Sequence, residues 1–149
     1  MKNTLIAAPW LSGEIKLPAK SGLSLMRPRN RSRAAVVVPN GTLFGDGVCA
    51  RIKEDLLKDF NLHTIVRLPN GVFAPYTSIP TNVLFFDRSG PTQDVWYYEH
   101  GLPEGRKNYT KTQPIQFEEF AALKAWWGQR EENERAWKVP AAELLANNC

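Results

Sequence analysis

Short apolar runs separated by polar stretches set the hydrophobic pattern of this chain from residue 33 onward. Residues 34–38 are continuously apolar and end at Pro39, which is typical of a strand buried on both faces of a parallel sheet. Apolar residues then recur four apart over residues 48–60, which predicts an amphipathic helix with Asp46 as its N-cap. A second strand over residues 62–68 completes a predicted β-α-β unit with a right-handed crossover.

The rest of the chain predicts one more strand of this sheet and an extension. Residues 69–80 are rich in Pro, Gly and Asn and lack helical periodicity, so an apolar strand at 82–86 can return antiparallel to its predecessor. Further elements are expected beyond it: an edge strand at 95–98, a helix at 117–127, a brief strand at 137–139 and a short helix opened by Pro140.

The predicted fold class is therefore α/β with a mixed sheet, in three parts. Residues 1–32 form an irregular basic leader with a short helix near residues 23–26, residues 33–88 form the sheet, and residues 89–149 form an α/β C-terminal extension with a helix. No apolar run approaches the roughly 18 residues of a membrane span. With 43% hydrophobic and 23% charged residues, we expect a soluble cytoplasmic protein without membrane contact.

Charge and cysteine usage add little chemistry. The net charge of +4 is uneven, because residues 1–45 hold seven Lys/Arg and one acid (+6) and the remaining 12 Lys/Arg and 14 acids sum to −2. This basic end could attract phosphate backbones or could be a solvated arm. Cys49 and Cys149 fit reduced thiols, and His63 and His100 are isolated, so no metal site is predicted.

Several ordered segments carry a family resemblance: RAAVVVPNGTLF (33–44), LHTIVRLPNGVF (62–73), TNVLFF (81–86), GRKNYTKT (105–112) and ENERAWKV (132–139). Over about residues 22–146 the chain closely resembles the modification subunits of bacterial type I restriction-modification systems. The resemblance implies a Rossmann-like, adenine-specific DNA methyltransferase fold. Residues 34–38, 62–68 and 82–86 would be its fifth, sixth and seventh strands, with the last strand antiparallel.

The same resemblance implies what this chain does not supply. The family binds S-adenosylmethionine on a Gly-rich turn after the first strand and holds the target amine with an Asn-Pro-Pro motif after the fourth; neither occurs here. Residues 30–32 also depart from the family's Gly-Gly-like turn. We therefore expect a fragment, from an interrupted gene or an expressed piece, that neither binds S-adenosylmethionine nor turns over alone. The complete subunit would use that cofactor.

One loop residue carries the expected contact with the target base. Methylation of an adenine amine in duplex DNA requires a flipped base held against an aromatic or apolar surface. The resemblance places Phe73 at the position that stacks on the flipped adenine, supported by Pro69, Gly71, Thr81 and Asn82. Without the resemblance, packing of Phe73 against the sheet would be the preferred interpretation.

Partners follow from the same reasoning. Arg106, Lys107 and Lys111 are candidates for contact with DNA phosphates, while a specificity subunit and a second modification subunit would complete a type I complex. The Tyr97-Tyr98 and Trp126-Trp127 pairs are expected in the core or at a subunit interface. A non-catalytic DNA-binding or subunit-assembly module remains the alternative, and an Asn-Pro-Pro motif in the upstream flank of the gene would favour the methyltransferase.

Overall fold

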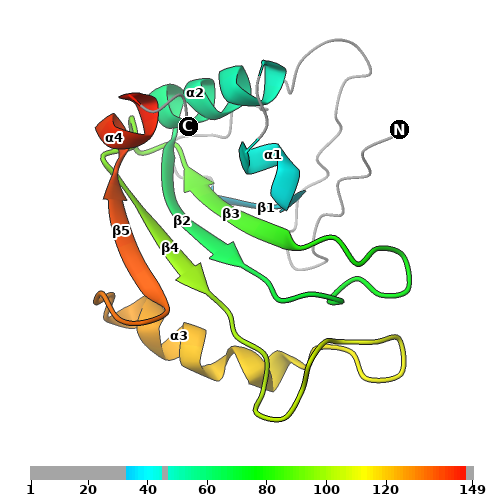
Figure 1. Cartoon of the computed structure of the whole chain (residues 1–149). Coiled ribbons are helices and arrows are strands. Elements are labelled where there is room, and N and C mark those ends of the chain that lie inside the picture. Colours follow the sequence, from blue (N-terminus) through cyan, green and yellow to red (C-terminus); the bar gives the residue numbers. More distant parts are fainter. Residues whose placement is uncertain (1–32, 45–46, 147–149) are drawn as a thin grey trace.

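A computed structural model describes residues 33–44 and 47–146 of this chain, which form one mixed sheet with helices on both faces (Figure 1). The strands are β1 (Arg33–Pro39), β2 (Asn61–Arg67), β3 (Thr81–Asp87), β4 (Asp94–Glu99) and β5 (Ala136–Pro140). The helices are α1 (Asn40–Phe44), α2 (Val48–Asp59), α3 (Ala121–Gly128) and α4 (Ala141–Ala146), with a 3-10 helix, η1 (Phe117–Phe120), before α3. The expected leader, its short helix and the Asp46 cap lie outside the described residues; α2 begins after Gly47.

The order of the strands confirms the expected mixed sheet. The five strands lie in the order β1-β3-β2-β4-β5, so β3 is inserted between β1 and β2 and runs antiparallel to both. β2 and β4 pair in parallel, while β4 and β5 pair antiparallel. β1, β2 and β4 therefore point the same way, and α2 makes the crossover that two parallel strands require.

One expectation about the elements was wrong. Residues 95–98 belong to β4, which is paired on both sides; the strand at that end of the described sheet is β5. The aromatic run resembled a half-exposed edge, but Val95 and Tyr98, 0% and 4% exposed, are buried in different core clusters. Residues 40–44, for which no helix was predicted, form α1 directly after β1.

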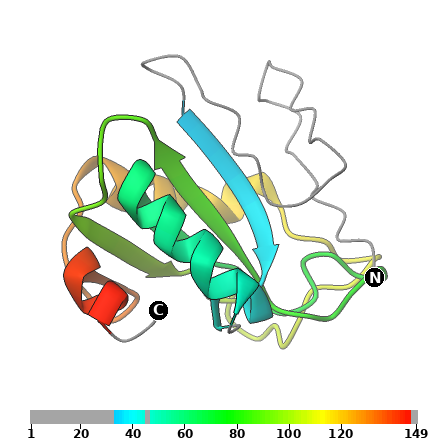
Figure 2. The same cartoon turned by 90° about the horizontal axis from the view of Figure 1, so that it is seen from above.

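Helices cover both faces of the sheet (Figure 2). The apolar core therefore forms two layers, one on each face. On one face, α2 packs Leu56, Leu57 and Phe60 against β2, β3 and β4, with α1 and α4 alongside. On the opposite face, α3 packs Leu123 and Trp126 against β2, β4 and β5. The 3.6-residue period of α2 aligns its apolar side chains along one stripe, which is why this helix covers the sheet.

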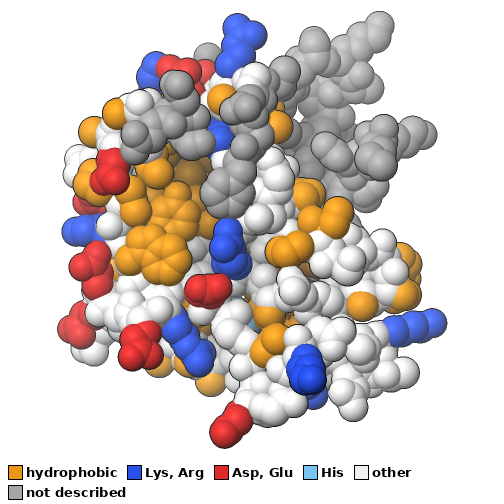
Figure 3. All heavy atoms as spheres, viewed as in Figure 1, with side chains coloured by type: hydrophobic (Ala, Val, Ile, Leu, Met, Phe, Trp, Pro, Cys, Tyr) orange, Lys and Arg blue, Asp and Glu red, His pale blue; other side chains and the backbone are white. Residues whose placement is uncertain are grey.

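The two residues of the Tyr97-Tyr98 pair lie on opposite faces of the sheet. Tyr98 and Trp126, only 4% and 8% exposed, are core residues in contact on the α3 face, with ring centroids 4.9 Å apart. Tyr97 points to the other face, where its ring stacks on Trp137 with the ring centroids 5.6 Å apart and an interplanar angle of 5°. Trp137 stays 42% exposed, and apolar side chains gather over this part of the surface (Figure 3).

Candidate functional site

The carboxyl ends of β1, β2 and β4 meet at one edge of the sheet because these strands share a direction. Three segments leave the sheet there: α1, residues 68–80 and residues 100–116. The last two run side by side as long loops beyond the sheet, and both views agree on this placement (Figures 1 and 2). Ligand sites of open α/β sheets occur at this edge, which makes it the candidate site.

A partly buried polar cluster joins the ends of β1 and β2 to the start of β3 at this edge. The Asn40 side-chain oxygen accepts hydrogen bonds from the Arg67 guanidinium at 3.0 Å and from the Asn82 amide at 3.1 Å. The Asn40 backbone N–H donates to the Pro80 carbonyl at 2.8 Å. Asn82 is 1% exposed and Thr81 6%, so both expected supporting residues are internal. Their role in this structure is to fix the start of β3 beside α1.

A hollow of about 290 Å³ lies beside that cluster; its lining residues are Asn40, Arg67, Leu68, Pro69, Asn70, Pro80, Glu99 and His100. Its volume lies just below the range of roughly 300–1,000 Å³ typical of small-molecule pockets. No glycine-rich strand-to-helix turn borders it, and both charges and prolines line its wall. That this chain does not bind S-adenosylmethionine stays a prediction from its sequence.

Residues 69–80 form a loop held by its own backbone. Ala74 donates to the Gly71 carbonyl at 3.0 Å, and Tyr76 donates to the Phe73 carbonyl at 2.9 Å. The Ala74–Pro75 peptide bond is cis. Tyr76 is 92% exposed and Ile79 57%, so the loop presents apolar side chains to solvent.

Phe73 lies in this loop between the core and the surface. Its side chain is partly buried and packs against the α3-face cluster that contains Val66, Leu68 and Tyr98. It is not among the residues that line the hollow, whereas Pro69 is. Packing and base stacking therefore compete as explanations for an aromatic residue here, and any test of stacking needs a variant that retains the packing.

The second loop, residues 100–116, is attached to the first by a group of residues that we name the Tyr109 cluster: Gly71, Arg106, Tyr109 and Glu119. Tyr109 is 1% exposed, and its backbone N–H donates to the Asn70 carbonyl at 3.2 Å. Its hydroxyl donates to the Glu119 carboxylate of η1. Gly71 has φ +79°, and a Cβ there would lie 2.2 Å from the Tyr109 carbonyl oxygen.

The hydrogen bond between the Tyr109 hydroxyl and the Glu119 carboxylate shifts the pKa of both groups. Burial, with the hydrogen bond to Glu119, raises the pKa of Tyr109 to about 12. The same hydrogen bond is the main cause that lowers the pKa of Glu119. The Arg106 guanidinium lies 5.3 Å from the centroid of the Tyr109 ring and 3.8 Å from a Glu119 oxygen. The hydroxyl therefore stays a donor and the carboxylate stays charged at neutral pH.

The three basic residues singled out in the sequence differ in exposure. Lys107 and Lys111 are exposed on the 100–116 loop. Arg106 is partly buried, and one of its terminal nitrogens is buried without a hydrogen-bond partner. The two lysines are thus free to meet an anionic partner, whereas the guanidinium is turned toward Glu119.

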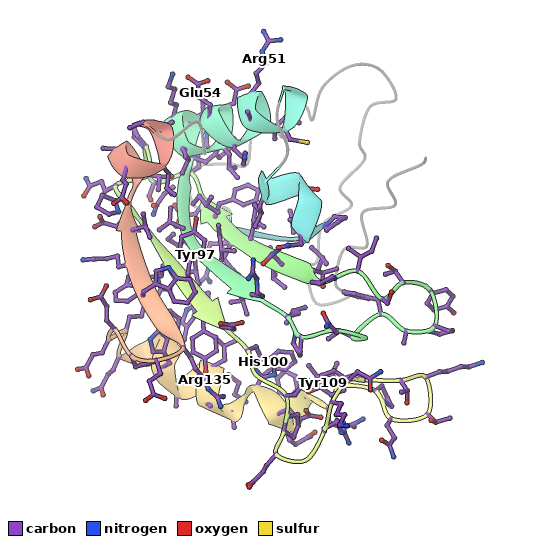
Figure 4. The ribbon with its side chains drawn as sticks, in the orientation of Figure 1. Arg51, Glu54, Tyr97, His100, Tyr109 and Arg135 are labelled. Carbon is purple, nitrogen blue, oxygen red and sulfur yellow. The ribbon has the colours of Figure 1, made fainter. Side chains whose placement is uncertain are left out.

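His100 lies where β4 ends and the second loop begins (Figure 4). Its ring stacks on Phe120 at 4.7 Å, and its backbone N–H donates to the Arg67 carbonyl at 2.9 Å. Burial lowers its pKa; the nearby Glu119 carboxylate opposes this effect and Arg135 reinforces it. The lowered pKa favours the neutral imidazole, which lines the hollow and stacks on Phe120 of the 3-10 helix.

Sequence reasoning did not identify Asn40, Tyr109 and Glu119 as parts of this site. Tyr109 lies in a polar, basic stretch without apolar periodicity, so nothing in its neighbourhood predicts burial. The Gln116–Glu119 spacing of a capping box was available as a signal for η1. Within residues 33–44 and 47–146 no group of three His, Cys, Asp or Glu is placed to hold a metal ion. No helix in that part is long and apolar enough to cross a membrane.

Comparisons with known proteins agree on one family. A model of the family N-6 DNA Methylase matches residues 24–149. The methylase subunit of the type I restriction enzyme EcoEI from Escherichia coli is 56% identical over 126 residues, which cover 80% of this chain and 26% of that subunit.

Solved structures agree in fold. The modification subunit of a putative type I restriction enzyme from Vibrio vulnificus YJ016 is 67% identical with a TM-score of 0.73, over 75% of this chain and 23% of that one. A chain from a structural study of complex assembly in the type I R-M system is 43% identical with a TM-score of 0.75, over 82% of this chain and 28% of that one. The chain spans about a quarter of the length of these relatives.

Proposed function

The chain belongs to the N-6 DNA methylase family, and we propose that it forms the DNA-facing side of the catalytic domain in a type I adenine methylase subunit. The observation that carries this proposal is the edge at which β1, β2 and β4 end. Two loops extend from it, one with Phe73 and the other with Lys107 and Lys111. An aromatic side chain and exposed cations on neighbouring loops suit a flipped base on its phosphate backbone.

Each residue would contribute binding and orientation only. The Phe73 ring would stack on the extruded adenine, an interaction worth roughly 1–3 kcal/mol per base. Lys107 and Lys111 would contact phosphates and so position the duplex, with Arg106 adding charge from its partly buried place beside Glu119. S-adenosylmethionine supplies the methyl group in the complete subunit, and the groups that hold the amine in line would come from outside this chain.

The test uses Phe73 variants in a complete methylase subunit that includes these residues. Phe73→Leu retains apolar volume against Val66 and Leu68 but removes the stacking face, so methyl transfer to hemimethylated duplex should fall by about 5- to 150-fold, the equivalent of 1–3 kcal/mol. Phe73→Trp should retain most of the rate. S-adenosylmethionine affinity, measured by titration calorimetry, should stay unchanged in both.

The control is the free energy of unfolding of each variant. If Phe73→Leu keeps the full rate, or if rate, cofactor affinity and stability fall together, Phe73 is a packing residue and the base-stacking role is wrong. Phe73→Ala belongs in the series as the combined loss of packing and stacking, and it should be the slowest of the three.

A second candidate function, subunit assembly, is favoured by the Tyr97–Trp137 stack. Trp137 is 42% exposed on the α2 face, away from the two loops. Large aromatic side chains half-exposed on a sheet are typical of protein–protein contact surfaces. Trp137→Ala should then weaken association with the specificity or second modification subunit, measured by analytical ultracentrifugation, and leave DNA affinity unchanged.

A further inference from the structure

The structure points to a positioning residue for the base-contacting loop. We propose that Tyr109 holds the 69–80 loop in place, through its backbone contact with Asn70 and Gly71 and its hydroxyl bond to Glu119, so that Phe73 is already oriented when DNA binds. This inference rests on the proposed function for the role of Phe73 and on geometry alone for the attachment of the loop.

The first argument is the burial of Tyr109. It is among the largest fully buried side chains of the described residues. Yet it lies in the 100–116 loop and belongs to no helix or strand. A loop residue of that size is buried only where the loop itself is docked. Here the docking partner is the turn at residues 70–71, the start of the loop that carries Phe73.

The second argument is the close approach of the two backbones. Gly71 lies with its α-carbon against the Tyr109 peptide, and no side chain would fit between them, since a Cβ would come within 2.2 Å of the carbonyl oxygen. The Tyr109 N–H donates to the Asn70 carbonyl on the same side. Two residues before Phe73, the chain is thus fixed by contact and by a hydrogen bond.

The third argument is the anchor at the far end of the Tyr109 ring. The Glu119 carboxylate accepts from the Tyr109 hydroxyl with one oxygen and from the Gln116 backbone N–H, at 2.9 Å, with the other. Arg106 lies over the ring and beside the same carboxylate. Because η1 leads directly into α3, which packs on the core, Tyr109 connects the Phe73 loop to a rigid part of the fold.

Hydrogen exchange in the 149-residue chain tests this attachment without methylation. Tyr109→Phe removes the hydroxyl and keeps the ring, and a hydrogen bond to a charged group is worth a ten- to hundredfold change in an opening equilibrium. The amides of Ala74, Tyr76 and Thr77, which bond within the loop, should exchange faster by that order. The strand amides of β2 and β3 should not change.

Two further variants keep the result interpretable. Tyr76→Phe makes the same chemical change at a side chain that is 92% exposed on the same loop, and it should leave exchange as in the parent chain. Glu119→Gln weakens the acceptor without touching Tyr109 and should accelerate the same three amides. An equal acceleration across loop and strands in both cluster variants, or no acceleration in either, overturns the proposal.

The functional consequence separates from the base-stacking role. In a complete subunit, Tyr109→Phe should lower the methylation rate in proportion to the fraction of loops that the variant leaves open, and it should leave S-adenosylmethionine affinity unchanged. If the loop amides respond but neither Tyr109→Phe nor Phe73→Leu affects methylation, the attachment stands and the base-stacking function fails. If methylation falls without any change in loop exchange, Tyr109 is not a positioning residue.

Discussion

Gly71→Ala offers the sharpest test of the packing at the candidate site, because the chain contains a matched control in Gly105. Both glycines have left-handed backbone angles, φ +79° and +78°. An alanine at either position therefore incurs a similar conformational penalty, about 1–2 kcal/mol, partly offset by a less flexible unfolded chain. The two sites share this backbone angle and differ in what the new methyl group would meet.

At Gly71 the methyl group would lie 2.2 Å from the Tyr109 carbonyl oxygen, whereas nothing lies within 4 Å at Gly105. An ordinary contact needs more than 3.4 Å, so the two backbones would have to separate by over 1 Å. The obstacle is a main-chain carbonyl, which cannot rotate away as a side chain could. Overpacking of this kind costs about 1–3 kcal/mol, so Gly71→Ala should be less stable than Gly105→Ala by that amount.

The assay is urea unfolding at 25 °C, followed by the fluorescence of the five tryptophans. The free energies of unfolding of both variants are compared with that of the parent chain, together with the dependence on urea, to show that the extent of unfolding is the same. Equal losses in the two variants would refute the close approach of Gly71 to Tyr109. A larger loss in Gly105→Ala would refute it as well.

Three further outcomes are expected. The isolated chain should not bind S-adenosylmethionine, because the Gly-rich turn and the Asn-Pro-Pro motif that the family resemblance implies do not occur in its sequence; saturable micromolar binding in calorimetry would contradict this. The midpoint of thermal unfolding should depend on protein concentration, because β1 pairs only with β3 in the described sheet and leaves a strand edge open to association; a monomeric, concentration-independent melt would argue against it. Burial lowers the pKa of His63 and of His100 below the ordinary 6.5, so the unfolded chain takes up protons first as the pH falls. The free energy of unfolding should therefore decrease from roughly pH 7 downward until the folded-state histidines also titrate, and the double variant His63→Gln/His100→Gln should show a flatter profile; the same slope in both proteins would exclude the histidines as the cause.

Local sequence patterns predicted the strands and the main crossover because these depend on apolar periodicity. The runs at 34–38, 62–68 and 82–86 correspond to β1, β2 and β3, and the four-residue spacing over 48–60 corresponds to α2. The antiparallel direction of β3 was predicted, but its place between β1 and β2 was not, and periodicity could not have given it. Strand order depends on contacts between segments about fifty residues apart, and no local pattern encodes them.

The features that the sequence did not predict depend on contacts between distant segments. An aromatic run such as 95–98 has the same composition in an edge strand and in an internal one, and only the neighbours of β4 distinguish them. Arg106 and Tyr109 stand in a stretch that looks solvated, yet Glu119 draws both inward. Phe73 was identified by resemblance, while its packing against Val66 and Leu68 became visible only in the fold.

The insertion of β3 between β1 and β2 also constrains the order in which the polypeptide can assemble. When β1, α2 and β2 have left the ribosome, neither strand has its final neighbour, because the strand that joins them lies later in the chain. Synthesis at about 5–20 residues per second leaves the two strand edges unpaired for seconds, long enough for association with other nascent chains. During synthesis, the edges of β1 and β2 that later pair with β3 are therefore exposed for an interval, although both are covered in the finished sheet.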